Sequence, residues 1–388
     1  MNELETHEND SASLRDISKT FDPARLIQAR RVNKLSKTEL HRRVGVSAAA
    51  IGQYERGEVT PRADTISALS EALHVPAGFF AHGRPKVRLD VAQASFRRLR
   101  ATTVAQQQQA VAYVEQVWEL ATYLEERVEF PEVNLPHWVQ YDDGTPRDAP
   151  DPITAAREVR KYWELGTDPI KFLIYELERH GILTVLFTLK EDDAADETRH
   201  IDAFSTSALP RPIIVLTPDK ADDVLRHRFS AAHELGHLVL HHGQQSTDSI
   251  SEREADAFAA EFLTPREELR KELPIRFNLS RLDELSQKWG ASPKSLVFRS
   301  KELELISEAT ARRAYITLSN LGKAGVIQAQ PINRFPGENP ELLKNAIELL
   351  DEANVPLTQI ARDLQMSPRH IHRLAGIEDV KPKLRLVR

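Results

Sequence analysis

The sequence predicts a mainly α-helical protein that contains a small antiparallel β-sheet, an α+β fold with more than one domain. Most of the chain carries apolar residues at helical spacing. Three short runs rich in β-branched residues, at 182–187, 200–205 and 211–216, are separated by polar, turn-like segments. Such runs are typical of an antiparallel sheet. The length of 388 residues exceeds that of one ordinary domain.

Composition narrows the classes of function. The net charge is −6, so any surface that binds nucleic acid must be local. The chain has no cysteine, which excludes disulfides, zinc–thiolate sites and thiol nucleophiles; a metal must be held by His, Asp or Glu. The acidic N-terminus has no apolar core, and no run of about 18 apolar residues occurs. We therefore expect a cytoplasmic protein that neither spans nor binds a membrane.

The order of polar and periodic segments predicts five parts. We expect a disordered tail at 1–20, a helical domain at 21–82, and a basic connector with a long helix and a loop at 83–150. An α+β domain at 151–330 and a helical module at 331–388 follow. The last module repeats a helix–break–helix spacing like that of a helix-turn-helix. We expect a helical dimerisation or lid module there, with a second DNA-binding element as the alternative.

A tight turn organises the N-terminal domain. Gly45 separates a helix that ends near Arg43 from a helix that starts after Ser47, and Ser47 is a suitable N-cap. This is the pattern of a helix-turn-helix, whose second helix, at 48–55, would enter the major groove of double-stranded DNA. A small helical interaction domain with solvated charges is the alternative.

Few side chains of that second helix can read bases. Ala48 and Ala49 can contact a thymine methyl group, and Gln53 can pair with adenine. Basic residues around the motif are suited to phosphate contacts. They are Arg25, Arg30, Arg31, Lys34, Lys37, Arg42, Arg43 and Arg56.

Residues 24–80, with the stretch "YERGEVTP", closely resemble the Xre/Cro-type helix-turn-helix. Lys37 stands where that family usually has glutamine, so a phosphate contact would be kept with a changed geometry. The resemblance implies a transcriptional regulator that binds an operator as a homodimer on two half-sites.

The stretch "HRFSAAHELGHLVLHH", 227–242, predicts a metal site. His233 and His237 lie on one face of a helix, so their imidazoles can share one cation. A zinc ion with three protein ligands keeps a position for water and lowers the pKa of that water to about 7. Glu234, beside it, would act as the general base. We expect the helix to begin with Thr217 as its N-cap; an amphipathic helix without a metal is the alternative.

The third ligand is sought in "SEREADAFAAEFLTP", 251–265, a second helix with Ser251 as the expected N-cap. Glu252 is the preferred ligand. Asp256, one turn later, is placed to hydrogen-bond the outer nitrogen of a ligand histidine. Glu254 and His241 remain alternative ligands.

Together with residues 285–307, these two stretches resemble the ImmA/IrrE family of metallopeptidases over residues 160–325. The resemblance implies a zinc-peptidase fold in which a small antiparallel sheet packs on the active-site helix. It implies His233, His237 and Glu252 as zinc ligands and Glu234 as the catalytic base. Known targets of that family are regulatory proteins, such as repressors cleaved during stress or induction of a mobile element.

Two functions follow from different classes. The first is a DNA-binding regulator with a zinc endopeptidase that cleaves a regulatory protein, a repressor or itself, in a stress response. The second is a transcription factor whose peptidase-like domain is a non-catalytic sensor or scaffold. A weaker third is the regulatory half of a toxin–antitoxin or phage-related module. Glu234 favours the first, because a structural zinc site needs no base and is closed by a fourth protein ligand.

Overall fold

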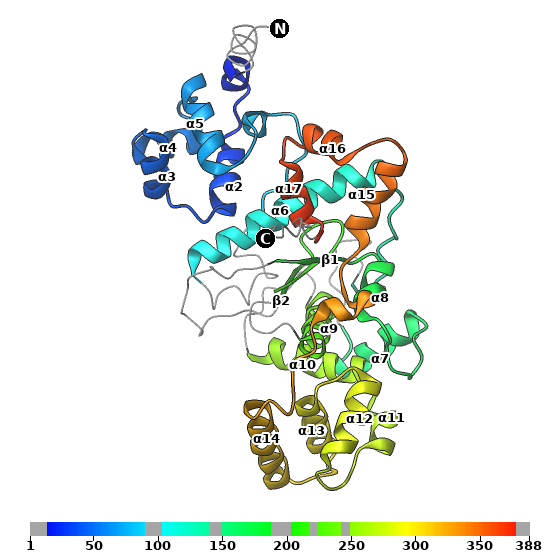
Figure 1. Ribbon diagram of the computed structural model, residues 1–388. Helices are drawn as coiled ribbons and strands as arrows, with labels where there is room; N and C mark the ends of the chain where they lie inside the picture. Colours follow the sequence, from blue (N-terminus) through cyan, green and yellow to red (C-terminus); the bar gives the residue numbers. More distant parts are fainter. Residues whose placement is uncertain are drawn as a thin grey trace, which may run out of the picture. The chain divides into compact units, whose positions relative to one another are not determined.

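The computed structural model describes residues 14–89, 103–139, 149–187, 203–217, 223–241 and 249–377, which form two compact units (Figure 1). Within the described chain, the first unit comprises residues 14–89, 103–129 and 343–377, and the second comprises residues 130–342. The fold is mainly helical with one small sheet, as the sequence predicts. No helix in the described ranges is long and apolar enough to cross a membrane.

Short, well-capped helices begin the first unit. Ser36 caps one helix through a reciprocal capping box with Glu39, and Ser47 caps the next by accepting the Ala50 N–H. Gly45, at φ 78°, ends the helix before the turn in the left-handed region that glycine tolerates best. The elements are α2 (Pro23–Val32), α3 (Lys37–Val44), α4 (Ala48–Arg56), α5 (Ala63–Leu73) and the 3-10 helix η1 (Ala77–Phe80).

The segment preceding α2 differs from the disordered tail that the sequence predicts. Residues 14–19 are helical, and the Ser18 hydroxyl donates to the Pro61 carbonyl at 2.6 Å. Polar composition hides this contact, because it joins residues 43 positions apart. Residues 1–13 of the predicted tail lie outside the described ranges.

A long helix, α6 (Val104–Glu125), forms the centre of the first unit and packs against α2. Its buried polar side chains all have partners. Glu119 accepts from Arg25 of α2 and from Arg84 at 3.0 Å, and Gln116 pairs with His370 at 2.7 Å. His370 belongs to α17 (Pro368–Leu374), which follows α15 (Leu342–Glu352) and α16 (Leu357–Asp363). Buried charge is tolerated here because each group is paired.

The second unit contains a three-stranded sheet with the order β1-β3-β2, built from β1 (Leu183–Leu186), β2 (Ala203–Thr206) and β3 (Ile213–Leu216). β2 pairs antiparallel with β3, as predicted, but β1 pairs parallel with β3. The expectation of a wholly antiparallel sheet is therefore wrong for β1. Sixteen residues separate Leu186 at the end of β1 from Ala203 at the start of β2, which is too many for a tight hairpin between these strands. β3 lies between β1 and β2 in the sheet instead.

Helices surround this sheet. One apolar core joins the sheet to α9 (Val224–Leu240) and α10 (Ser249–Leu263) through residues such as Ile214, Leu235 and Phe258. A second core, around Leu285 and Trp289, holds the later helices together. The other elements are α7 (Pro152–Tyr162), α8 (Leu173–Arg179), α11 (Arg266–Glu272), α12 (Leu279–Trp289), α13 (Pro293–Glu302), α14 (Glu308–Lys323), η4 (Ile332–Arg334) and η5 (Pro336–Glu338).

Two helix starts differ from the predicted ones. In the described chain α9 begins at Val224, with Asp223 rather than Thr217 as its N-cap; residues 218–222 lie outside the described ranges. α10 is described from Ser249 onward, so Ser251 lies inside the helix and is buried. Several polar residues near each start can cap a helix, and tertiary packing selects one of them.

Candidate metal centre and DNA-binding surface

The helix α9 places two histidines on one side. His233 is fully buried and His237 is half-buried one turn later. The apolar residues Ala231, Leu235 and Leu238 bury the other side of the helix in the core of the second unit. The His233 and His237 Nε2 atoms lie 2.9 Å apart, so both imidazoles face one point.

Gly236 lets the helix α10 approach this point. A Cβ atom at Gly236 would lie 3.2 Å from the Ala255 Cα atom and 3.1 Å from the Phe258 ring. The two backbones can pack this closely only because the glycine has no side chain. Ala255 is one turn after Glu252, so this contact brings the start of α10 beside the two histidines.

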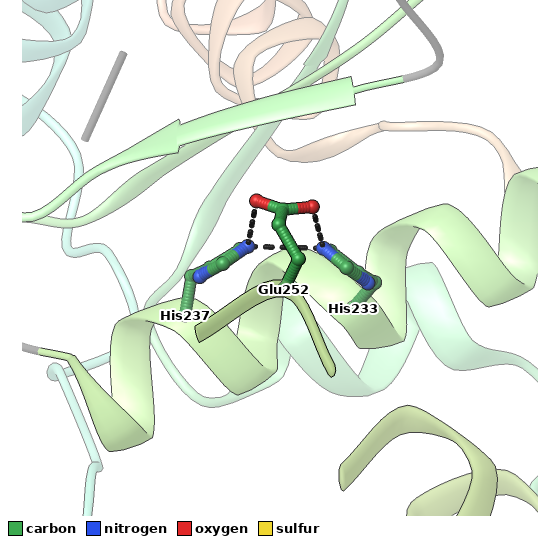
Figure 2. A group of neighbouring side chains, drawn as sticks. All are labelled: His233, His237 and Glu252. Atoms are coloured by element: carbon green, nitrogen blue, oxygen red, sulfur yellow. Dashed lines mark hydrogen bonds and ion pairs between the residues drawn. The ribbon is translucent and has the colours of Figure 1, made fainter. Parts of the chain in front are cut away.

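Glu252 completes the cluster. Its carboxylate lies across the two imidazoles, with Oε1 3.3 Å from the His237 Nε2 atom and Oε2 3.5 Å from the His233 Nε2 atom (Figure 2). We call His233, His237 and Glu252 the metal triad. Their potential ligand atoms all lie within 4.8 Å of one another.

The donor atoms of the metal triad fit zinc. Tetrahedral zinc with bonds of about 2.0–2.1 Å to nitrogen and oxygen requires ligand atoms about 3.3 Å apart. Here the two Nε2 atoms lie 2.9 Å apart, and each lies 3.3 or 3.5 Å from a different oxygen of the Glu252 carboxylate. Two imidazoles and one carboxylate also leave the fourth position for water or substrate, which is the composition of catalytic rather than closed structural sites.

Each triad histidine is held from behind by a hydrogen bond at Nδ1. The His233 Nδ1–H donates to Asp256 Oδ1 at 2.7 Å. This bond fixes the proton on Nδ1 and leaves the Nε2 lone pair directed at the metal position, as ligand histidines require. Asp256, one turn after Glu252, thus makes the hydrogen bond to the outer nitrogen of His233.

On the other side a longer chain of contacts supports His237. Its Nδ1 lies 3.2 Å from the His241 Nδ1 atom, and the His241 Nε2 atom lies 2.8 Å from Glu254 Oε2. A carboxylate can only accept, so His241 carries its proton on Nε2 and accepts at Nδ1 from His237. The His237 Nε2 lone pair then faces the metal position. His241 and Glu254, the alternative ligands, therefore lie behind His237 in this structure and not in the metal triad.

Glu234 follows His233 on α9 and is buried. Ser205 of the edge strand β2 donates its hydroxyl proton to Glu234 Oε2 at 2.7 Å. This bond orients the carboxylate in a place that water scarcely reaches. Glu234 therefore holds a fixed orientation on α9, directly after the triad residue His233.

In the first unit, α3, the Gly45 turn and α4 form a helix-turn-helix. Ala49 and Gln53 are exposed on α4, and Ala48 is half-buried. Arg42 and Arg43 are exposed at the end of α3, and Ser47 is exposed at the start of α4. These side chains lie on the two helices and the turn that meet DNA in this motif.

Comparison with family models gives a match in each unit. Residues 177–301 match the IrrE N-terminal-like domain, the Peptidase_M78 family. Residues 26–80 match the helix-turn-helix model. The chain therefore combines a stretch similar to helix-turn-helix domains with a stretch similar to IrrE N-terminal-like domains. A search of curated proteins found no match to the chain.

The match to the IrrE-like domain contains the metal triad, Glu234 and Ser205, whereas α6 and α15–α17 lie outside both matches. Sequence reasoning missed Ser205, because nothing in the strand pattern links it to a helix 29 residues later. The supporting role of His241 had a signal: His241 follows His237 by four residues, the spacing of neighbours on one helix face.

Two basic residues of the helix-turn-helix domain require a correction. Arg25 and Arg30, expected to contact phosphates, are buried. Arg25 pairs with Glu119, and the Arg30 Nε atom lies 2.5 Å from Glu55 Oε1. Both arginines therefore hold the domain together, because burial with a carboxylate partner leaves no donor surface for DNA.

Two further basic residues, the half-buried Lys37 and the exposed Arg56, are paired. Lys37 lies 3.1 Å from Glu55 Oε2, and the Arg56 Nε atom lies 2.5 Å from Glu58 Oε1. The hydrogen bond from Arg56 lowers the pKa of Glu58, so that pair stays charged at neutral pH. DNA phosphates would compete with these carboxylates for the two cations, which weakens their contribution relative to Arg42 and Arg43.

Proposed function

We propose that this DNA-binding regulator carries a zinc-dependent endopeptidase that cleaves a regulatory protein, a repressor or the regulator itself. The metal triad carries the proposal: two imidazoles and a carboxylate have the spacing of a zinc site with one open position. A buried glutamate next to that site adds the acid–base group that hydrolysis needs.

The residues divide the chemistry as follows. Bound zinc would supply Lewis acidity to a peptide carbonyl and to a water molecule. Glu234 takes a proton from that water onto its carboxylate while the water oxygen bonds to the carbonyl carbon. Glu234 then gives the proton to the peptide nitrogen as the C–N bond breaks, which leaves one new carboxylate and one new amine.

Other side chains keep this geometry in place. Ser205 donates to Oε2 of Glu234 and so restricts the rotation of the carboxylate. Asp256 and His241 hold the ligand imidazoles in the tautomer that presents Nε2. A site arranged in advance in this way loses less free energy to reorganisation during the reaction.

Zinc content and proteolysis can be separated by one substitution. We expect the wild type and Glu234→Gln to contain close to one zinc ion per chain by elemental analysis. Quantitative proteomics of cells should show one or more regulatory proteins cleaved by the wild type and intact with Glu234→Gln. Glu284→Gln, which removes an exposed carboxylate on α12, is the matched control and should cleave like the wild type.

Two results would contradict the proposal. A purified wild type that takes up no zinc removes the metal site. The Glu234→Gln variant could instead hold zinc and give the same protein fragments and the same promoter responses as the wild type. That result would favour a non-catalytic sensor or scaffold.

We propose that the helix-turn-helix domain binds operator DNA as a homodimer, with α4 in the major groove. Selection from a random DNA pool would supply the operator, and fluorescence anisotropy would measure its affinity against salt. Arg42→Gln and Arg43→Gln should each lower the slope of log affinity against log salt by about 1, because each removes a phosphate contact. Arg312→Gln, exposed on α14, is the control. Unchanged slopes would place the DNA surface elsewhere.

Gln53 and the dimer have their own tests. Gln53→Ala should relax the preference for one base pair per half-site at a cost of about 1–3 kcal/mol. Sedimentation equilibrium should give a dimer, and footprints should show half-sites about 34 Å apart or a multiple of it. A monomer that binds a single unpaired site would contradict the dimer.

A further inference from the structure

A pocket of about 300 Å³ opens in the second unit between α9, α10, α13 and α14. It lies where the core of the sheet and α9 meets the separate core of the later helices. Pockets of this volume between packed modules are typical of small-molecule sites. Its apolar walls include Phe229, Ala260, Leu263, Ala291, Phe298 and Tyr315.

The pocket is separate from the catalytic face of the metal triad. Asp256 lines it and hydrogen-bonds the Nδ1 atom of His233. The metal position lies at the opposite ring nitrogen, Nε2, where Glu252 approaches. A molecule in the pocket would therefore touch the support of a metal ligand and not the open position at the metal.

One wall of the pocket is positively charged. Lys294 and Ser295 come from the first turn of α13, a ten-residue helix whose N-terminus is the positive end of its dipole. Lys294 is exposed and forms no ion pair with any residue that the structure describes. Asp256, on α10, disfavours a second anion on its own side of the pocket.

A second cation reaches the pocket from deeper in the fold. Arg299 is 2 % exposed and is held by Glu302 at 2.6 Å, by Glu261 at 2.8 Å and by the Thr264 carbonyl at 2.7 Å. Its Nε atom has no hydrogen-bond partner within the described ranges. Two carboxylates already pair with this guanidinium, so its Nε atom adds a hydrogen-bond donor, and not an unpaired charge, to the same wall.

We propose that this pocket binds a small amphipathic carboxylate, with its apolar body between Phe298, Phe229 and Tyr315 and its carboxylate at Lys294. The volume and the apolar walls select a compact hydrocarbon body. Lys294 and the α13 N-terminus favour a ligand with an anionic group. The carboxylate of Asp256 repels that group and so directs it toward Lys294. Such a ligand would join the helices of the metal triad to α13 and α14. This site is independent of the proposed peptidase activity.

Calorimetry on the full-length, zinc-free protein tests the ligand class with hexanoate, octanoate and octanol as probes. Octanoate should bind one per chain, and hexanoate should bind more weakly by about fourfold per lost methylene group. Octanol has the same hydrocarbon chain without the charge, so it should bind about three- to fivefold more weakly than octanoate.

Two variants locate the site. Lys294→Gln should weaken octanoate binding about three- to fivefold and leave octanol binding unchanged, since only the charge contact is lost. Phe298→Ala should weaken both probes about tenfold, because the shared apolar wall is removed. Phe298 is half exposed, so the protein should stay folded, which a melting curve verifies.

Matched controls lie on the same two helices outside the pocket. Lys301→Gln removes a charge from α13, and Ile316→Ala removes an exposed apolar side chain from α14; both should bind octanoate like the wild type. The proposal is overturned if octanoate does not bind. It is also overturned if octanol binds as tightly as octanoate, or if Lys294→Gln and Phe298→Ala behave like the controls.

Discussion

Replacing His241 by phenylalanine tests how the metal triad is supported. Phenylalanine fills the buried space of the imidazole, which is 8 % exposed, but cannot accept the proton of His237 Nδ1. The lost contact is 3.2 Å long, at the weak end for a hydrogen bond. Removing an outer partner of a ligand histidine weakens metal affinity by roughly 10- to 100-fold. We expect the low end, about tenfold, or about 1.4 kcal/mol.

The assay is a titration of zinc against a coloured chelator at neutral pH. Glu254→Gln should have a smaller effect, about threefold, because the amide oxygen still accepts from His241 but without charge. Glu284→Gln removes an equivalent exposed carboxylate on α12 and should leave zinc affinity unchanged.

Two outcomes would refute this reasoning. If His241→Phe binds zinc as tightly as the wild type, the contact with His237 does not support the site. If the variant loses zinc altogether while its melting curve is normal, His241 is itself a ligand.

Four further substitutions test the fold. Gly236→Val should lower the free energy of urea unfolding by about 2 kcal/mol, since its side chain meets α10 within 3.3 Å; an unchanged value would refute the close approach. Gly45 has φ 78°, so Gly45→Ala should lower the free energy of unfolding by about 1 kcal/mol. Gly322 lies in open space on α14, so Gly322→Ala should raise the free energy of unfolding by up to about 1 kcal/mol. Equal effects of the two substitutions would contradict the special role of the backbone conformation at Gly45. Burial lowers the pKa of His370 to about 3, so the unfolded chain binds a proton that the folded chain does not as pH falls below about 6.5. Stability should then decrease toward pH 3 by at most about 1.4 kcal/mol per pH unit, and less so in His370→Gln. Parallel pH profiles of the two proteins would exclude this contribution from His370.

The sequence by itself determined the local parts of this protein. The spacing of His233 and His237 places both on one helix face, whatever surrounds that helix. Gly45 and Ser47 specify a helix end and a helix start within three residues, which is enough to predict the turn between α3 and α4. These features depend on contacts within one or two turns of chain, so the amino-acid order encodes them directly.

Tertiary structure decided which distant residues meet. Glu252 rather than Glu254 faces the two histidines, because the contact of Gly236 with Ala255 sets the rotation of α10 against α9. In the same way β3 occupies the centre of the sheet, and Arg25 is buried on Glu119 instead of facing solvent. Each outcome depends on how closely two surfaces from separate parts of the chain pack, and that distance is not encoded in any local pattern of residues.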